Sequence, residues 1–383
     1  MKELLQQTGI PESLMQALEK QKISTPTEVQ RKVLPAFMEN RDLIVQSETG
    51  SGKTLAYLLP LYKKVDPSKR EMQALVLVPT HELAIQVLRQ IEALSQFSDV
   101  KVRSTSIVGN VNIQRQIDKL KEKPHIIVGT PGRVMELISR KKIAAHTIST
   151  IVIDEADRLI DHNNFSVIQD IVKRTLRDRQ LLLFSASISK DAQEKAASMM
   201  NDPLLISPEK GLQIPQGIVH YYIVSELRDK METLRKAIRS AAPQKAIVFI
   251  GDREDAEVCA AKLSYHKLKA DSLHGQNVKM DRKKIMEDFK SGRTEVLVAS
   301  DLAARGLDIE DVTHIFNFHM PRDPKDYLHR AGRTGRKGQS GMVISIVTES
   351  DLELIRRYEK ALGITISRKV LKKGTLMDPL IKN

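Results

Sequence analysis

The chain has 383 residues, more than one hydrophobic core usually serves, so two domains are expected. Its 41% hydrophobic and 28% charged residues are typical of a globular protein, and no apolar run approaches the roughly 18 residues of a membrane-spanning helix. Lysine and arginine outnumber aspartate and glutamate by 61 to 48, and the net charge of +13 favours a polyanionic partner without identifying it.

Short runs rich in valine, isoleucine and leucine recur along the first half of the chain. They fall at Leu43–Val45, Leu75–Val78, Ile126–Val128, Ile151–Ile153 and Leu181–Phe184. Apolar runs separated by amphipathic stretches such as Glu82–Leu94 are typical of buried parallel strands joined by crossover helices. We therefore predict the α/β class, with a mostly parallel sheet and helices on both faces.

A second set of runs follows at Ala246–Ile250, Val296–Ala299, His314–Phe318 and Met342–Val347, with a helix predicted over Asp281–Phe289. The proline- and glycine-containing segment from Asn201 to Gly217 separates the two sets and is the best candidate for a linker. We place the first domain at 1–207, the linker at 208–217 and the second domain at 218–383. After Val347 we expect only one amphipathic helix, Ser350–Leu362, and a short basic tail.

A glycine-rich segment, Gln46 to Thr54, follows the first apolar run and precedes an apolar helix, Leu55–Leu61. Its glycines would let backbone N–H groups approach phosphates, its lysine can reach the β- and γ-phosphates, and its threonine can ligate Mg²⁺. Ser47 stands where the pattern G-x-x-x-x-G-K-[ST] has glycine, and a chance glycine turn is the alternative interpretation. The predicted nucleotide contacts are Thr49, Gly50, Ser51, Gly52, Lys53 and Thr54.

An acidic run, Asp154-Glu155-Ala156-Asp157, follows the strand predicted at Ile151–Ile153. The first aspartate can hold the hydration shell of Mg²⁺, and Glu155 can orient or polarise an attacking water. Such a run alone is more often a solvated acidic turn. Together with the phosphate loop it predicts hydrolysis of ATP, with Thr54 and Asp154 as metal ligands.

Arginine and glycine alternate in the second half, in the segment His329 to Arg336. Phosphoryl transfer develops negative charge on the γ-phosphate, and arginines supplied by another domain commonly stabilise it. An exposed basic loop that binds phosphates elsewhere is the alternative.

The motifs, in their order along the chain, resemble those of the DEAD-box RNA helicases of superfamily two, from about Leu5 to Val347. The matching segments are Pro26-Thr27 with Gln30 (Q motif), Ser47–Thr54 (motif I), Pro79–Ala84 (Ia), Thr130–Arg133 (Ib), Asp154–Asp157 (II), Ser185–Ser187 (III), Ser300–Asp308 (V) and Tyr327–Arg336 (VI). The resemblance implies two tandem RecA-like domains and an RNA-dependent ATPase that unwinds or remodels short RNA duplexes or RNA–protein complexes by closure of its lobes.

The resemblance also assigns roles to single residues. It implies nucleotide contacts for Thr27, Gln30 and Asp308, and coupling of hydrolysis to unwinding for Ser185 and Ser187. The catalytic set that it implies is Lys53, Asp154, Glu155, His329, Arg333 and Arg336. The RNA contacts that it implies are Thr80, His81, Gly109, Thr130, Arg133, Arg282 and Ser300.

The chain departs from the family pattern at several positions. Aromatic residues of the family are replaced by Leu5 and Ile23, and other motif residues by His81, Asn110 and Lys279. We expect these changes to affect adenine selectivity and RNA affinity more than phosphate binding. Ser187 replaces a threonine and keeps its hydroxyl, so coupling is expected to survive.

Two other functions stay open on the residues alone. A DNA-unwinding helicase of the same superfamily is one, although the Q motif and the Asp-Glu-Ala-Asp run favour RNA. The other is an ATP-gated RNA clamp or assembly factor with little strand separation. With 4% aromatic residues and no tryptophan we expect largely sequence-independent RNA backbone contacts. Protein partners could then confer specificity.

The compartment is predicted from two features of the sequence. The amino terminus lacks the apolar stretch of a secretory signal, and the single cysteine, Cys259, allows no intramolecular disulfide. We therefore expect a cytoplasmic protein. Separately, we expect a monomer that uses ATP and Mg²⁺ and does not associate with membranes.

Overall fold

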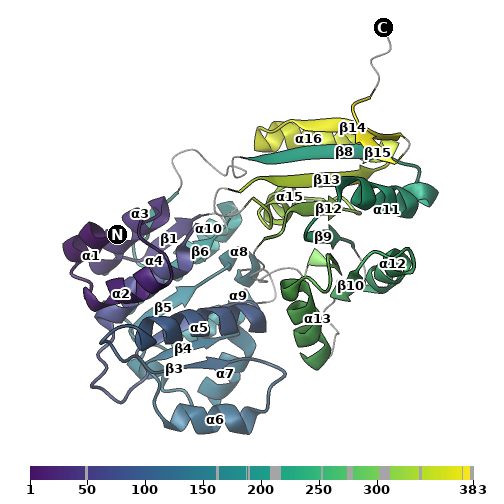
Figure 1. The fold of residues 1–383 in the computed structure, drawn as a ribbon. Coiled ribbons are helices and arrows are strands. Elements are labelled where there is room, and N and C mark those ends of the chain that lie inside the picture. Colours follow the sequence, from purple (N-terminus) through teal and green to yellow (C-terminus); the bar gives the residue numbers. More distant parts are fainter. Residues whose placement is uncertain are drawn as a thin grey trace. The chain divides into compact units, whose positions relative to one another are not determined.

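The computed structural model describes residues 1–47, 51–160, 164–186, 188, 190–207, 217–251, 253–273, 279–301, 311–335, 339–372 and 374–379. The chain divides into two compact units, Met1–Leu212 and Gln213–Asn383, and each is built on a sheet of its own (Figure 1). In the part of the chain that is described, no helix is long and apolar enough to cross a membrane.

The sheet of the first unit is parallel and has the strand order β3-β4-β2-β5-β6-β1-β7. Its strands are β1 Leu43–Gln46, β2 Ala74–Leu77, β3 Ser104–Ile107, β4 Ile126–Gly129, β5 Thr150–Ile153, β6 Gln180–Ser185 and β7 Leu204–Ile206. The helices are α1 Lys2–Thr8, α2 Ser13–Lys20, α3 Glu28–Met38, α4 Lys53–Lys64, α5 His81–Gln96, α6 Ile113–Lys121, α7 Pro131–Ser139, α8 Ala156–Leu159, α9 Phe165–Lys173 and α10 Lys190–Ala197.

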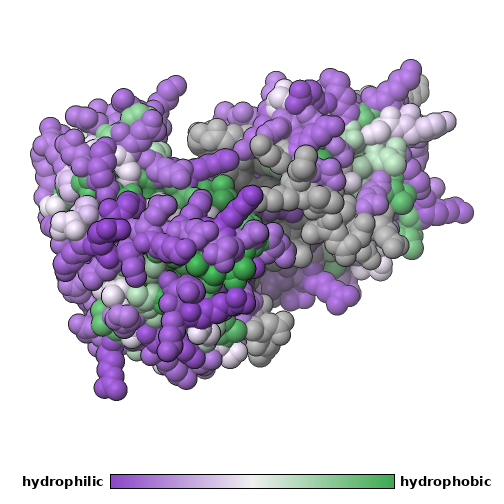
Figure 2. Space-filling model, turned by 90° about the horizontal axis from the view of Figure 1, so that it is seen from below, coloured by the Kyte–Doolittle hydropathy of each residue, from purple (hydrophilic) through white to green (hydrophobic). Residues whose placement is uncertain are grey.

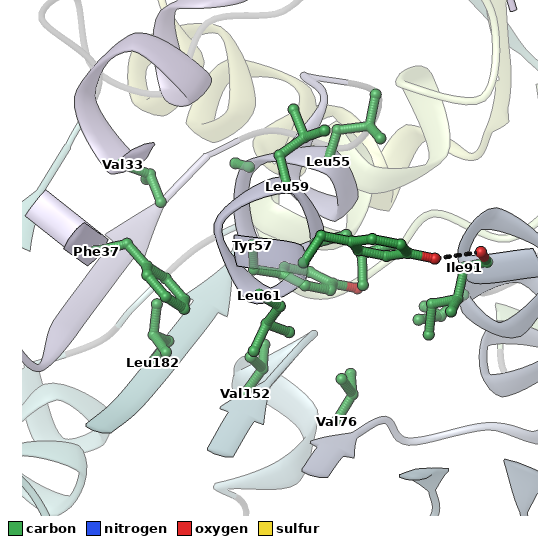
Figure 3. Close-up of a cluster of buried hydrophobic side chains, with 14 of the residues drawn as sticks. Val33, Phe37, Leu55, Tyr57, Leu59, Leu61, Val76, Ile91, Val152 and Leu182 are labelled. Carbon is green, nitrogen blue, oxygen red and sulfur yellow. Dashed lines mark hydrogen bonds between the residues drawn. The ribbon is translucent and has the colours of Figure 1, made fainter. Parts of the chain in front are cut away.

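Alternate side chains of these strands pack into two cores, because successive residues of a strand point to opposite faces of the sheet. One core joins the sheet to α3, α4 and α5, and Figure 3 shows Val76, Val152 and Leu182 of the strands beneath Phe37 and the side chains of α4. The other core joins strand residues that point to the opposite face, such as Ile44 of β1 and Leu75 of β2, to α7 and α9. Helices therefore cover both faces of the sheet, as predicted.

The second unit has the strand order β10-β11-β9-β12-β13-β8-β14-β15, parallel throughout except for the antiparallel pair β14-β15. Its strands are β8 Ile218–Val224, β9 Ala246–Phe249, β10 Ala270–Leu273, β11 Val296–Ala299, β12 His314–Asn317, β13 Gly341–Val347, β14 Ile366–Lys372 and β15 Thr375–Met377. Its helices include α11 Lys230–Ala241, α12 Arg253–Tyr265, α13 Lys279–Ser291, α15 Pro324–Ala331 and α16 Leu352–Leu362. Two further cores fill the two faces of this sheet.

The apolar runs of the sequence are confirmed as strands, each to within one residue of the bounds in the structure. Most of their side chains are buried. The face of the molecule drawn in Figure 2 is correspondingly hydrophilic for the most part, with apolar side chains in scattered groups. Burial of both faces of these strands explains why continuous apolar runs predicted them.

The prediction for the segment after Val347 was wrong. Besides the helix it contains two strands, β14 and β15, and β14 pairs in parallel with β8. Several of their side chains are exposed, as in Ser367 and Arg368, so the apolar run that marks a central strand is missing. Leu204–Ile206, which precedes the predicted linker 208–217, forms the strand β7 and pairs with β1. Residues 208–216 lie outside the described residues.

Candidate nucleotide and RNA site

The predicted motifs of the first unit come together at one edge of its sheet. Motifs I, Ia, Ib, II and III follow β1, β2, β4, β5 and β6, and the carboxyl ends of parallel strands meet at the same edge. The register places Gln46 beside Ser185 and Leu77 beside Ile153, so the segments that continue from these residues begin at the same level. Residues far apart in the sequence thus become neighbours.

The described part of the phosphate loop is held by its own side chains and by α3. Lys53 Nζ donates to the carbonyl oxygen of Ser47 at 2.8 Å, and the hydroxyls of Ser47 and Ser51 lie 2.6 Å apart. Gly52 precedes α4 with φ +90°, a conformation that favours glycine. Two of the predicted nucleotide contacts, Thr49 and Gly50, lie outside the described residues.

Gln30 links the Q motif directly to the phosphate loop. Its Nε2 donates to the carbonyl oxygen of Gly52 at 3.2 Å, and its Oε1 accepts from the backbone N–H of Thr27 at 3.0 Å. The side chain is 1% exposed, so its amide is fixed by the fold. A Cβ atom on Gly52 would lie 2.6 Å from Gln30 Nε2. The loop and the Q motif therefore form one close-packed cradle of polar atoms suited to a nucleotide.

Asp154 is 3% exposed and lies at the end of β5. Its Oδ1 accepts from the backbone N–H of Glu155 at 2.9 Å, and its Oδ2 accepts from the hydroxyl of Tyr57 at 3.0 Å. Burial raises the pKa of Asp154, and the positive charge of Lys53 acts in the opposite direction. Lysine and aspartate are therefore close enough to influence each other electrostatically.

Magnesium fits this donor set. It prefers oxygen ligands and is commonly held by one or two carboxylates together with substrate phosphates. The hydroxyl of Thr54 and the carboxylate of Asp154 supply such oxygens. Among the residues described, no three His, Cys, Asp or Glu side chains form a metal cluster of their own. Phosphate oxygens and water would supply the other ligands.

Glu155 has φ +50°, the left-handed region that a non-glycine residue rarely adopts. Its carboxylate forms an ion pair with Arg158, with Oε2 and Nη1 3.1 Å apart. Nearby, Ser185 Oγ donates to Asp157 Oδ1 at 2.8 Å and accepts from the Asp157 backbone N–H at 3.2 Å. Motifs II and III are thus joined by hydrogen bonds. Ser187 lies outside the described residues.

The predicted RNA contacts of the first unit lie in the loops and first helical turns after β2, β3 and β4. Thr80 Oγ1 accepts from the backbone N–H of Leu83 as the N-cap of α5, which begins at His81. Thr130 is the N-cap of α7. Arg133 donates to the carbonyl of Val111 and forms an ion pair with Glu136. A Cβ on Gly109, which follows β3, would meet nothing within 4 Å.

Three departures from the family pattern have structural explanations. Asn110 has φ +55°, a conformation that glycine adopts easily and asparagine tolerates. Leu5 is 1% exposed and part of the core around α3 and α4, and Ile23 packs against the same core. Both apolar residues therefore serve packing in this structure.

In the second unit, Arg330 of motif VI has a structural role that the sequence did not reveal. Its guanidinium bonds to both carboxylate oxygens of Asp301, at 2.7 and 2.6 Å, and also to Asn317 Oδ1 and the carbonyl of His319. Its side chain is 4% exposed, and the guanidinium carbon lies 4.9 Å from the ring centroid of Phe249. Motifs V and VI are therefore held together by this arginine.

The other described residues of the predicted site in the second unit lie in helices and loops next to its sheet. His329 lies in α15, Arg333 follows this helix with 6% exposure, Ser300 follows β11, and Arg282 lies in α13. Lys279 begins α13. Asp308 and Arg336 lie outside the described residues.

Comparison with known proteins agrees with this arrangement. The sequence matches the DEAD/DEAH box helicase family over residues 27–195 and the helicase conserved C-terminal domain over residues 229–338. It is 38% identical to the DEAD-box ATP-dependent RNA helicase CshC of Bacillus cereus, covering 95% of this chain and 93% of that protein. It is 39% identical to the probable ATP-dependent RNA helicase YfmL of Bacillus subtilis, covering 92% of each.

Solved structures of similar fold carry RNA and nucleotide. S. cerevisiae Dbp5 bound to RNA and ADP BeF3 has a TM-score of 0.87 and 29% identity, covering 96% of this chain and 95% of that chain. Mss116p bound to ssRNA and AMP-PNP has a TM-score of 0.85 and 25% identity, covering 96% and 78%. The chain belongs to the DEAD-box family of superfamily two helicases, and its two units are tandem RecA-like domains.

Proposed function

We propose that this protein is an ATP-dependent RNA helicase, which binds RNA and hydrolyses ATP to unwind or remodel short RNA duplexes or RNA–protein complexes. The observation that carries the proposal is the convergence of Gln30, Lys53 and Asp154 at the carboxyl edge of the first sheet. The relatives CshC and YfmL are named as ATP-dependent RNA helicases, and Dbp5 was solved with RNA and a nucleotide, which supports the same activity here.

The proposed division of labour in the nucleotide site follows from the chemistry of the side chains. Thr27 and Gln30 position the base, and Lys53 with the loop residues Ser51 and Gly52 binds the phosphates. Thr54 and Asp154 hold Mg²⁺, which when bound would neutralise charge on the phosphate oxygens. Glu155 orients the attacking water, with His329 as its partner. Arg333 and Arg336 supply positive charge to the γ-phosphate when the domains close.

RNA is proposed to bind through its backbone to the residues at the loop–helix junctions, Thr80, His81, Gly109, Thr130, Arg133, Arg282 and Ser300. Hydroxyls, backbone amides and arginines at such junctions bind phosphates and sugars with little sequence information. Protein partners would therefore contribute to target choice. We further propose that the chain acts as a monomer in the cytoplasm.

The nucleotide site is tested with two substitutions. Lys53→Ala removes the phosphate-binding cation, and Glu155→Gln removes the group that orients the water, so each should reduce RNA-stimulated ATP hydrolysis by at least about a hundredfold. Circular dichroism should show an unchanged fold. Lys69→Ala is the control, because Lys69 lies on an exposed loop outside the site. Wild-type turnover in either site variant would contradict the assignment.

Strand separation is tested apart from ATP hydrolysis, because an RNA clamp would bind RNA under ATP control without useful unwinding. Blunt and tailed RNA duplexes are incubated with the protein and either ATP or a nonhydrolysable analogue. A helicase should release the short strand, and a clamp should retain RNA without releasing it. ATP-dependent retention without release would favour the clamp.

A further inference from the structure

Tyr57 is a buried tyrosine in α4 whose hydroxyl reaches the acidic motif. Its side chain is 0% exposed, and its ring lies against that of Phe184 with centroids 5.2 Å apart. Its hydroxyl is 3.0 Å from Asp154 Oδ2. The two residues are 97 positions apart in the sequence. The contact therefore joins the helix of motif I to motif II through one hydrogen bond.

The direction of this hydrogen bond follows from the chemistry of the two groups. An ionised carboxylate only accepts, so the phenol donates. The Tyr57 hydroxyl is therefore a donor to the carboxylate of Asp154, one of the two proposed metal ligands.

The remaining acceptor capacity of Asp154 is what a metal site needs. A carboxylate has about four lone-pair positions. The Tyr57 hydroxyl uses one on Oδ2 and the backbone N–H of Glu155 uses one on Oδ1. Two donors on two different oxygens fix the plane of the carboxylate and leave acceptor positions on each oxygen.

We propose that Tyr57 is a positioning residue for Mg²⁺–nucleotide binding: its hydroxyl holds the carboxylate of Asp154 in the orientation that receives the hydrated ion. The inference rests on the proposed function, in which Thr54 and Asp154 hold the metal. Tyr57 is fully buried and acts through Asp154. Groups that orient a metal ligand in this way typically change metal affinity by 10–100-fold when they are removed.

The same helix offers a matched control. Tyr62 is 1% exposed, and its hydroxyl donates to the carbonyl oxygen of Ile91, the contact drawn as a dashed line in Figure 3. Tyr57→Phe and Tyr62→Phe each remove one hydroxyl from a buried ring of α4. Only the first removes a donor from the carboxylate. Both variants should therefore lose some stability, but only Tyr57→Phe should change the affinity for Mg²⁺.

The experiment measures binding of a fluorescent ADP analogue to the full chain as Mg²⁺ is titrated, without RNA and without turnover. Tyr57→Phe should raise the Mg²⁺ concentration at half-saturation about tenfold. Binding of the analogue in EDTA should stay near the wild-type level. Tyr62→Phe should match the wild type in Mg²⁺ dependence, and thermal unfolding reports how much each variant loses in stability.

A second measurement uses the pair of residues. In the Asp154→Asn background, Tyr57→Phe should have no further effect on Mg²⁺ dependence, because the tyrosine acts through the carboxylate. Equal Mg²⁺ dependence in Tyr57→Phe, Tyr62→Phe and wild type would overturn the inference. If Asp154→Asn itself left the Mg²⁺ dependence unchanged, the proposed metal ligand would be wrong, which is a different failure.

Discussion

At the residue scale, Gly52 shows how closely the nucleotide site is packed. Its φ of +90° lies in the region that L-residues rarely adopt, and Gln30 and Thr27 occupy the space beside its Cα. The neighbouring Lys53 and Thr54 begin α4, so the position of the glycine determines where the helix starts. Three requirements, a turn, a helix start and close contact with the Q motif, meet at one residue.

Gly52→Ala should therefore weaken nucleotide binding. The added Cβ would lie 2.6 Å from Gln30 Nε2, so either the glutamine moves or the loop does. A left-handed conformation costs an alanine about 1–2 kcal/mol, which corresponds to roughly a tenfold loss of affinity if the loop must reach this conformation to bind. Titration with a fluorescent ATP analogue measures this loss of affinity. Gly132→Ala, where a Cβ meets nothing within 4 Å, should bind nucleotide as the wild type does.

At the element scale, β8 shows how the second sheet is joined to the helix of motif VI. The strand pairs with β13 on one side and with β14 on the other. His220 of β8 is 6% exposed, and its Nδ1 lies 2.9 Å from the hydroxyl of Tyr327 in α15. Tyr327 in turn packs against Tyr358 of α16 with ring centroids 5.4 Å apart. The position of the motif VI helix thus depends on a polar contact inside the core.

The burial of His220 predicts a pH dependence of stability. Burial lowers the pKa of His220 to about 4, below its usual 6.5, so the folded protein holds the neutral ring while the unfolded chain binds a proton. Above pH 6.5 the ring is neutral in both states, so His220 costs the folded state nothing. As the pH falls from 6.5 toward 4, only the unfolded chain binds the proton, and the free energy of unfolding falls by roughly 3 kcal/mol in all. His220→Asn should flatten the decline of the unfolding midpoint between pH 7 and pH 5. Parallel curves for variant and wild type would contradict this.

At the scale of the whole molecule, charge and composition bear on RNA binding. The net charge is +13, aromatic residues are 4% of the chain, and tryptophan is absent from the sequence. Attraction to phosphates should therefore outweigh base stacking. The proposed RNA contacts are threonine, serine, histidine and arginine side chains together with backbone groups such as those of Gly109.

RNA affinity should accordingly fall steeply with salt. With about four neutralised phosphates and a slope of about −0.7 per phosphate, affinity should drop roughly fiftyfold between 50 and 200 mM salt. Fluorescence anisotropy of a labelled single strand in the presence of a nonhydrolysable ATP analogue measures the slope. Arg133→Gln should reduce the slope by about one phosphate, whereas Arg228→Gln, an exposed arginine outside the proposed contacts, should leave it unchanged. A flat salt dependence would count against backbone binding.

The sequence by itself determined the class of the fold, the motifs of the site and the central strands except β8, which lies between β13 and β14. Continuous apolar runs reveal a strand that is buried on both faces, and Lys53 with Asp154 could be linked because each follows such a strand. The peripheral strands β3, β10, β14 and β15 carry polar side chains and have no continuous apolar run. Only their pairing with neighbouring strands in the structure identifies them.

Only the tertiary structure decided which side chains support the motifs. Tyr57 lies in a helix that the sequence marks as apolar, and a buried hydroxyl signals that it needs a partner without saying which one. The partner of Tyr57 is Asp154 in motif II, and the partner of Arg330 is Asp301 in motif V. Each partner lies far from its residue in the sequence. Hydrogen bonds between such distant positions follow from how strands are ordered in the sheet, and local sequence patterns do not encode that order.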